Sequence, residues 1–191
     1  MIMKPTKFTL LIALLLSIML FNNCGEDEEA GSQFTGNYVI TEALVSESFN
    51  IPVTGIGNFP VPVNFAVTQA IQTALLSAVT CTSADKSYIE LREDFSLFLS
   101  CEGANPLNGG TWAEVSATEL QLNLNSTAVP SSPTGISLTV TDVVKSGTIL
   151  TGKTSVPLPK AFIASFISPL TLDASAPAIF LVKISLKFTQ K

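Results

Sequence analysis

Short runs in which apolar and polar residues alternate do most to constrain how this chain of 191 residues can fold. The clearest runs are 120–125 and 135–141, where every second side chain is apolar. A period of two is typical of a β-strand with one buried face and one face in water. With similar runs elsewhere, the sequence predicts about eight strands, near 36–46, 87–93, 95–101, 110–117, 119–125, 135–144, 147–155 and 178–189.

Eight short strands separated by polar turns predict a mainly β fold, either a single antiparallel β-barrel or a β-sandwich. Turns are expected at the Glu-Asp pair 93–94 and at the Asn-Gly-Gly sequence 108–110, because Asn and Gly accept a positive φ at little cost. In the last strand every second residue from Phe180 to Phe188 is apolar, which suits a strand that closes a barrel onto the first. The length fits one domain, residues 34–191.

A segment without any charged residue, 48–84, interrupts the strand pattern. Prolines and glycines predict a loop or irregular edge at 47–66, and apolar residues at helical spacing predict one amphipathic helix at 65–79. This helix either packs flush over the barrel mouth or an open sheet, or forms a lid over an apolar ligand. In the lid arrangement the ligand-binding residues are Val67, Ile71, Leu75, Phe95, Leu97 and Trp112. Further on, 156–177 is punctuated by prolines, and 161–167 is either a short helix or an edge strand.

The N-terminal residues have the organisation of a secretion signal. Two lysines precede an apolar stretch at 8–21, which is shorter than the about 20 residues that span a bilayer. Cys24 follows the sequence Leu-Phe-Asn-Asn, and this arrangement resembles the lipobox of bacterial lipoproteins, with Asn23 in place of the usual small residue. The resemblance implies a signal peptide at 1–23. The alternative is an ordinary cleaved signal followed by a chance cysteine.

In a lipoprotein, Cys24 is the acylated residue, here expected to carry palmitate, and it attaches the protein to the membrane. The acidic segment that follows, 25–33, is either a solvated linker or, by resemblance, the surface-export signal of Bacteroidetes-type lipoproteins. Residues 24–33 are therefore expected to form a lipidated tether. The mature protein is expected at the cell outer membrane, facing the periplasm or exposed on the surface.

Cys81 and Cys101 are the remaining cysteines, and they bracket the first predicted hairpin. A secreted chain folds in an oxidising compartment, where such a pair forms a disulfide. Redox-active pairs usually have CxxC spacing, which these two residues lack. The sequence therefore predicts a structural disulfide, whose closed loop of about 20 residues contributes roughly 3 kcal/mol by chain-entropy reasoning.

The composition disfavours most kinds of catalysis. The chain has no histidine, which excludes Ser-His-Asp triads, Cys-His dyads and His-ligated metals. No basic stripe is present for binding nucleic acid. The candidate carboxylates are Glu90, Glu93, Asp94, Glu102, Glu114 and Glu119. Most of them fall on predicted turns or wet strand faces, so a carboxylate-based hydrolase is a distant alternative. We expect a protein that is not an enzyme and has no cofactor or metal.

The order of motifs C…Y-x-E-L…F…C…G-G-T-W…L-x-L-x-L between Cys81 and Leu124, with Gly-Asn-Tyr at 36–38, resembles the lipocalin-like domains of small Bacteroidetes lipoproteins. The resemblance covers about residues 34–155 and implies an up-and-down barrel. It also implies a role in binding a small apolar molecule, or a structural role with a filled interior. In the first role Trp112 lines a pocket, and in the second it is a core aromatic residue. A module that binds a protein partner at the outer membrane is the alternative.

Overall fold

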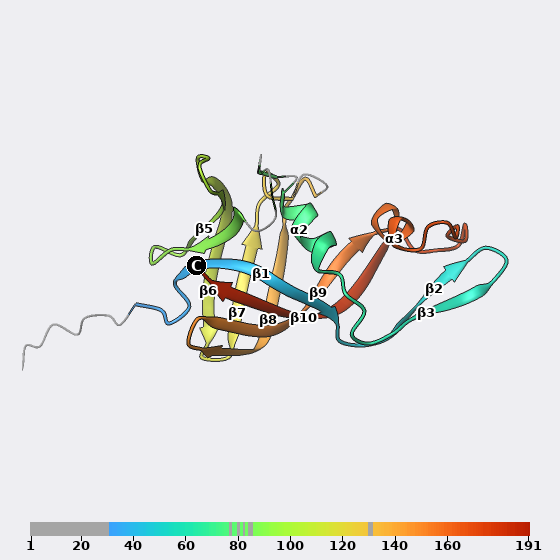
Figure 1. Cartoon of the computed structure of the whole chain (residues 1–191), viewed down its shortest axis with the longest axis horizontal. Helices are drawn as coiled ribbons and strands as arrows, with labels where there is room; N and C mark the ends of the chain where they lie inside the picture. Colours follow the sequence, from blue (N-terminus) through green and yellow to red (C-terminus); the bar gives the residue numbers. More distant parts are fainter. Residues whose placement is uncertain (1–30, 77, 80, 82, 84–85, 130–131) are drawn as a thin grey trace, which may run out of the picture. The chain divides into compact units, whose positions relative to one another are not determined.

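Eight antiparallel strands close into a β-barrel, as the cartoon of the structure shows (Figure 1). The strands are β1 (Gly36–Val45), β4 (Ser87–Leu91), β5 (Ser96–Cys101), β6 (Leu107–Ser116), β7 (Glu119–Leu124), β8 (Ile136–Ser146), β9 (Ile149–Pro159) and β10 (Ile179–Gln190). Each pairs with its neighbour in sequence, and β10 pairs with β1. The eight predicted strands and the barrel are therefore confirmed, and the sandwich is not.

This computed structural model describes residues 31–76, 78–79, 81, 83, 86–129 and 132–191. The predicted signal peptide, Cys24 and nearly all of the acidic tether lie outside the described residues. The side chain of Leu75 also lies outside them, although its backbone is helical. Phe34–Lys191 forms one compact unit, which contains the barrel. No helix in the described part of the chain is both long enough and apolar enough to cross a membrane.

The shortest pairing in the barrel joins β1 to β4, over Gly36–Tyr38 only. Beyond that point the edge of β1 is covered by the residues before and within helix α2 (Thr68–Leu76). The amide of Val67 donates to the Ala43 carbonyl at 2.9 Å, and Nε2 of Gln72 donates to the Ile40 carbonyl at 2.8 Å. The free edge of β1 is thereby satisfied by the extended segment before α2, where Leu44 and Ala66 form an antiparallel bridge, and by the helix itself. The predicted helix at 65–79 is confirmed in a shorter form.

The prediction of a loop or irregular edge at 47–66 is wrong, because the structure has a regular β-hairpin there, with strands β2 (Phe49–Val53) and β3 (Gly57–Val61). Its buried residues are apolar and share one face: Ile51, Val53 and Val61. Prolines are tolerated because both strands are edges of a two-stranded sheet. The hairpin extends away from the barrel, on the side of helix α3 (Figure 1).

The ambiguous segment 156–177 is resolved into the end of β9, helix α3 (Lys160–Phe166) and a loop. Nζ of Lys160 donates to the Asp173 carbonyl at 3.0 Å, which attaches this loop to the helix. A hydrogen bond from the side chain of Ser175 lowers the pKa of Asp173. The loop in turn pairs with the hairpin, since the Thr54 amide donates to the Thr171 carbonyl at 2.9 Å.

The turn predicted at the Asn-Gly-Gly sequence 108–110 is also wrong. These residues lie inside β6, where the register with β5 shifts, so they form a β-bulge. Gly110 has φ +132°, and a Cβ there would lie 1.9 Å from the Asn123 carbonyl oxygen on β7. The glycine is needed because a neighbouring backbone approaches closely. The other predicted turn, at 93–94, is present between β4 and β5.

The predicted cysteine pair is confirmed: the Sγ atoms of Cys81 and Cys101 lie 2.10 Å apart and their Cα atoms 5.5 Å apart. The disulfide joins the connection that follows α2 to the end of β5. It therefore ties the uncharged insertion covalently to the barrel.

Candidate functional site

The barrel interior has one packed end and one hollow end. At the packed end, Tyr38, Leu91 and Phe188 surround a gap of only about 20 Å³. Trp112 belongs to this end, since its Nε1 donates to the Arg92 carbonyl at 3.0 Å and its side chain is 2% exposed. The opposite end holds a cavity of about 310 Å³, which corresponds to about ten water molecules in liquid volume. We refer to it as the barrel cavity.

Every element around the hollow end contributes to the wall of the barrel cavity except β6. Its lining residues are Ile40, Ile71, Ile89, Leu97, Leu122, Leu124, Ala128, Val129, Ile136, Leu138, Thr154, Val156, Pro157, Leu158, Pro159, Phe162, Ile184, Leu186 and Phe188. Among these described residues there is no charged side chain. Ligand sites of this kind are mostly apolar, with a few placed polar groups that orient the ligand.

Thr154 supplies the hydroxyl in this wall. It lies on the inward face of β9 and is only 6% exposed. Its Oγ1 has no hydrogen-bond partner in the described part of the chain. A buried hydroxyl without a partner costs about 1–3 kcal/mol, so a ligand that hydrogen-bonds to Thr154 recovers this energy.

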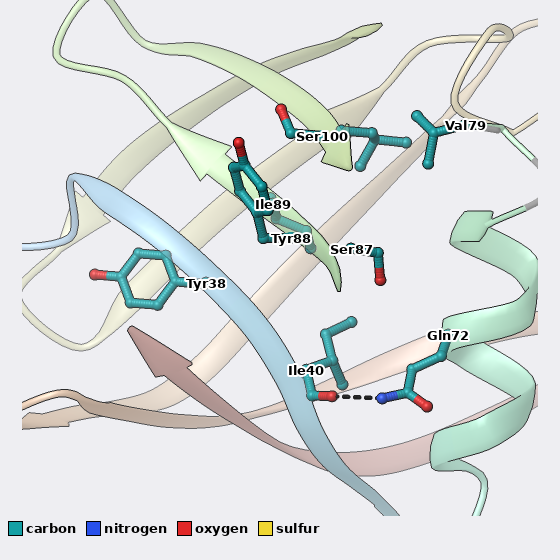
Figure 2. A pocket seen from close by; sticks show the side chains of 9 residues that line it. Tyr38, Ile40, Gln72, Val79, Ser87, Tyr88, Ile89 and Ser100 are labelled. Carbon is teal, nitrogen blue, oxygen red and sulfur yellow. Dashed lines mark hydrogen bonds between the residues drawn. The ribbon is translucent and has the colours of Figure 1, made fainter. Parts of the chain in front are cut away.

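A smaller gap lies behind α2, where β1 and β4 diverge, and Figure 2 shows it between Tyr38, Ile89 and Gln72. Its volume is about 20 Å³, which is room for about one water molecule. The bond from Gln72 to the Ile40 carbonyl, drawn in Figure 2, holds the helix against β1 at this point. The gap is too small for an organic ligand, so the barrel cavity is the candidate site.

The structure separates the residues that the sequence grouped as ligand-binding. Ile71 and Leu97 do line the barrel cavity. Val67 lines a second cavity beneath the β2–β3 hairpin instead. Trp112 lies at the packed end, and Phe95, which is 50% exposed, packs on it with ring centroids 5.3 Å apart.

Sequence reasoning missed the walls that β8, β9 and α3 contribute, among them Leu138, Thr154 and Phe162. The alternation of 135–144 does place Leu138 on the buried face, so that signal was present. Thr154 was not recognisable, because a threonine within a strand is ordinary on either face. Phe162 lies in the segment whose secondary structure the sequence left open.

The charged residues of the described chain lie away from this cavity. Hydrogen bonds from the side chains of Ser96 and Lys191 lower the pKa values of Asp94 and Glu102, respectively. Both acids are exposed, in the connections on either side of β5. These shifts come from local surface contacts. The candidate carboxylates therefore do not converge on the barrel cavity.

No known family model matches the chain, and no curated protein matches it.

Proposed function

We propose that this protein is a lipid-anchored lipoprotein of the bacterial cell envelope, whose barrel binds a small, neutral, apolar molecule without catalysing a reaction. The observation that carries the proposal is the barrel cavity, about 310 Å³ in volume and walled by aliphatic and aromatic side chains. This volume is at the lower end of the range for small-molecule sites, about 300–1,000 Å³.

The apolar walls of the barrel cavity offer dispersion contacts and apolar surface to a ligand that enters it. The packed end shows that this chain can fill its interior, since Tyr38 and Phe188 meet there edge to face. A hollow end next to a filled end is best accounted for by a ligand that occupies it.

The wall chemistry favours a neutral ligand. Burial of an ionised carboxylate without a partner is very costly, and the described lining has no cation to pair with one. Thr154 offers a hydroxyl that can donate or accept a hydrogen bond. We therefore expect the cavity to prefer an alcohol, ketone or ester over a fatty acid.

Binding of decanol to the soluble part of the chain, residues 30–191, tests this function. Isothermal titration calorimetry is expected to give saturable binding in the micromolar range. Leu138→Trp places an indole in the cavity and is expected to abolish binding while the protein still folds. Thr139→Trp is the matched control, because Thr139 is the next residue of β8 and is exposed on the outer face. It is expected to bind like the unchanged protein.

Two outcomes would contradict the proposal. One is that decanol and other neutral apolar molecules show no saturable binding. The other is that Leu138→Trp and Thr139→Trp bind equally well. Either result favours the reading in which the barrel has a structural role.

The lipoprotein part of the proposal predicts that Cys24→Ala blocks acylation. The full-length variant, expressed in a bacterium that processes lipoproteins, is expected to leave the membrane fraction or to remain unprocessed. It should also lose labelling by radioactive palmitate, because it lacks the acylated thiol. Asn23→Ala is the control and should keep its label, since it brings the sequence closer to the lipobox. Unchanged membrane partition and palmitate labelling of Cys24→Ala would refute the anchor.

A further inference from the structure

A second apolar cavity lies beside the barrel cavity, beneath the β2–β3 hairpin. Its volume is about 270 Å³, close to that of the first. We refer to it as the hairpin cavity. Its lining residues are Val45, Phe49, Ile51, Phe59, Val61, Pro62, Phe65, Val67, Leu158, Ile163, Phe166, Ile167, Ser168, Pro169, Leu170 and Val182. The described residues of this lining include no charged side chain either.

Leu158 of β9 lines both cavities. The side chains of two neighbouring elements, β10 and α3, are also divided between the two cavities. On β10, the inward-facing Ile184 lines the barrel cavity and Val182 lines the hairpin cavity. On α3, Phe162 faces the first and Ile163 the second. Leu158 is thus the side chain that the two linings share, and we refer to it as the partition.

The Leu158 side chain has free volume on both sides. Such a side chain has room to move between staggered rotamers without a shift of the backbone. Thr154 and Leu158 both face inward on β9 and are four residues apart. At about 3.3 Å per residue they are separated by about 13 Å along the strand. A chain that begins at Thr154 and runs along β9 would therefore reach the partition.

We propose that the two cavities are two chambers of one binding site for a long unbranched hydrocarbon with a neutral polar end. The polar end lies at the Thr154 hydroxyl, and the tail passes Leu158 and ends under the hairpin. This inference rests on the proposed function and names its ligand class. A flexible chain fits because each chamber alone is small and the passage is one side chain wide.

The hairpin is the element that the barrel itself does not require. Its strands take no part in the eight-stranded sheet. Ile51 and Val61, on its buried face, form the outer wall of the hairpin cavity, and Phe59 lies at its rim, 38% exposed. The insertion therefore adds a second apolar chamber to a barrel that is already closed.

A series of straight-chain primary alcohols of increasing length tests the inference by calorimetry. In the unchanged protein the affinity is expected to rise about fourfold per added methylene, and to go on rising beyond the length that fills the barrel cavity. Val182 lines only the hairpin cavity, so in Val182→Trp, whose indole occupies that cavity next to the passage, the rise should stop at that length. Short alcohols such as octanol should still bind, because they need only the first chamber.

Phe59→Asp provides a second variant in case Val182→Trp fails to fold. It places a charge at the rim of the hairpin cavity and should weaken only the long alcohols, by tenfold or more. Ile56→Asp is its matched control, since Ile56 lies in the turn of the same hairpin, is 57% exposed and is not a lining residue. It should leave the affinities of the whole alcohol series unchanged.

Thr154→Val should reduce the preference for an alcohol over the alkane of equal length.

The failure of this inference can be told apart from failure of the proposed function. If no alcohol of any length binds, the proposed function itself fails. If short alcohols bind but the affinity stops rising at the same length in the unchanged protein and in Val182→Trp, the barrel cavity is a site and the second chamber is not. An equal loss of long-chain binding in Phe59→Asp and Ile56→Asp would also overturn the two-chamber site.

Discussion

Replacement of Trp112 by alanine is expected to lower the free energy of unfolding by about 3–5 kcal/mol, as is usual when a buried aromatic residue is truncated. Trp112 is 2% exposed and is the largest of the fully buried side chains. Its removal leaves a void at the packed end and takes away the donor to the Arg92 carbonyl. Urea denaturation followed by circular dichroism measures the effect, since the only tryptophan fluorescence is lost with the residue.

Phe95→Ala is the control for this experiment. The Phe95 ring packs on Trp112, but it is half exposed and leaves no enclosed void. An aromatic contact of this kind is worth about 0.5–1.5 kcal/mol beyond the area it buries, so the loss should be clearly smaller. If both substitutions cost the same, or if Trp112→Ala costs less than Phe95→Ala, the packed end does not hold the barrel together as described.

Removal of the Cys81–Cys101 disulfide has the second largest expected effect, about 3 kcal/mol. The bond closes a loop with a sequence separation of 20, and without it the unfolded chain gains conformational freedom. For a domain of this size the melting temperature should fall by roughly 6–12 °C. Scanning calorimetry of the Cys81→Ala, Cys101→Ala double variant measures the change.

The control is the same scan in the presence of a reductant. Reductant should lower the melting temperature of the unchanged protein to a similar extent and should have no effect on the double variant. If the two cysteines react freely with alkylating reagents before reduction, the disulfide is absent from the folded protein, and the explanation of any temperature shift must change.

The eight strands could be predicted from the sequence because each has one face in the core. Phe98 is apolar at a position of β5 where the alternation predicts a polar residue. Its side chain lies on the outer face of the barrel. The guanidinium of Arg92 lies 3.7 Å above the Phe98 ring while it also pairs with Glu90. A cation over an aromatic face covers apolar surface that water would otherwise meet. Phe98 is thus covered by Arg92, a neighbouring side chain that the period of two does not identify.

The turn predicted at 108–110 and the loop predicted in the insertion were both wrong because a local sequence signal depends on which strands lie beside it. Asn-Gly-Gly gives the same local signal in a turn and in a bulge, and only the approach of Asn123 on another strand decides between them. In the insertion, proline suggested a loop because its missing donor argues against a central strand. An isolated hairpin has only edge strands, so this objection does not apply there.

The cavities could not be predicted from the sequence, because their volumes depend on how side chains from many elements fill one space. Ile71 and Leu97 are among the predicted ligand-binding residues, and both line the barrel cavity. Trp112 is another predicted ligand-binding residue, but it lies at the packed end. Its position depends on the stagger of neighbouring strands around the barrel, which sets how deep each side chain lies.

The pairing of β1 with β10 has a consequence for how the chain acquires its fold. Thr41 donates its hydroxyl hydrogen bond to the carbonyl of Lys187, a residue 146 positions later. Contacts of such high sequence separation slow folding, because loop closure comes before any stabilising contact. Since the first strand needs the last as its neighbour, the barrel cannot close on a growing chain. β1 therefore has no β10 neighbour until residues 179–190 have been synthesised.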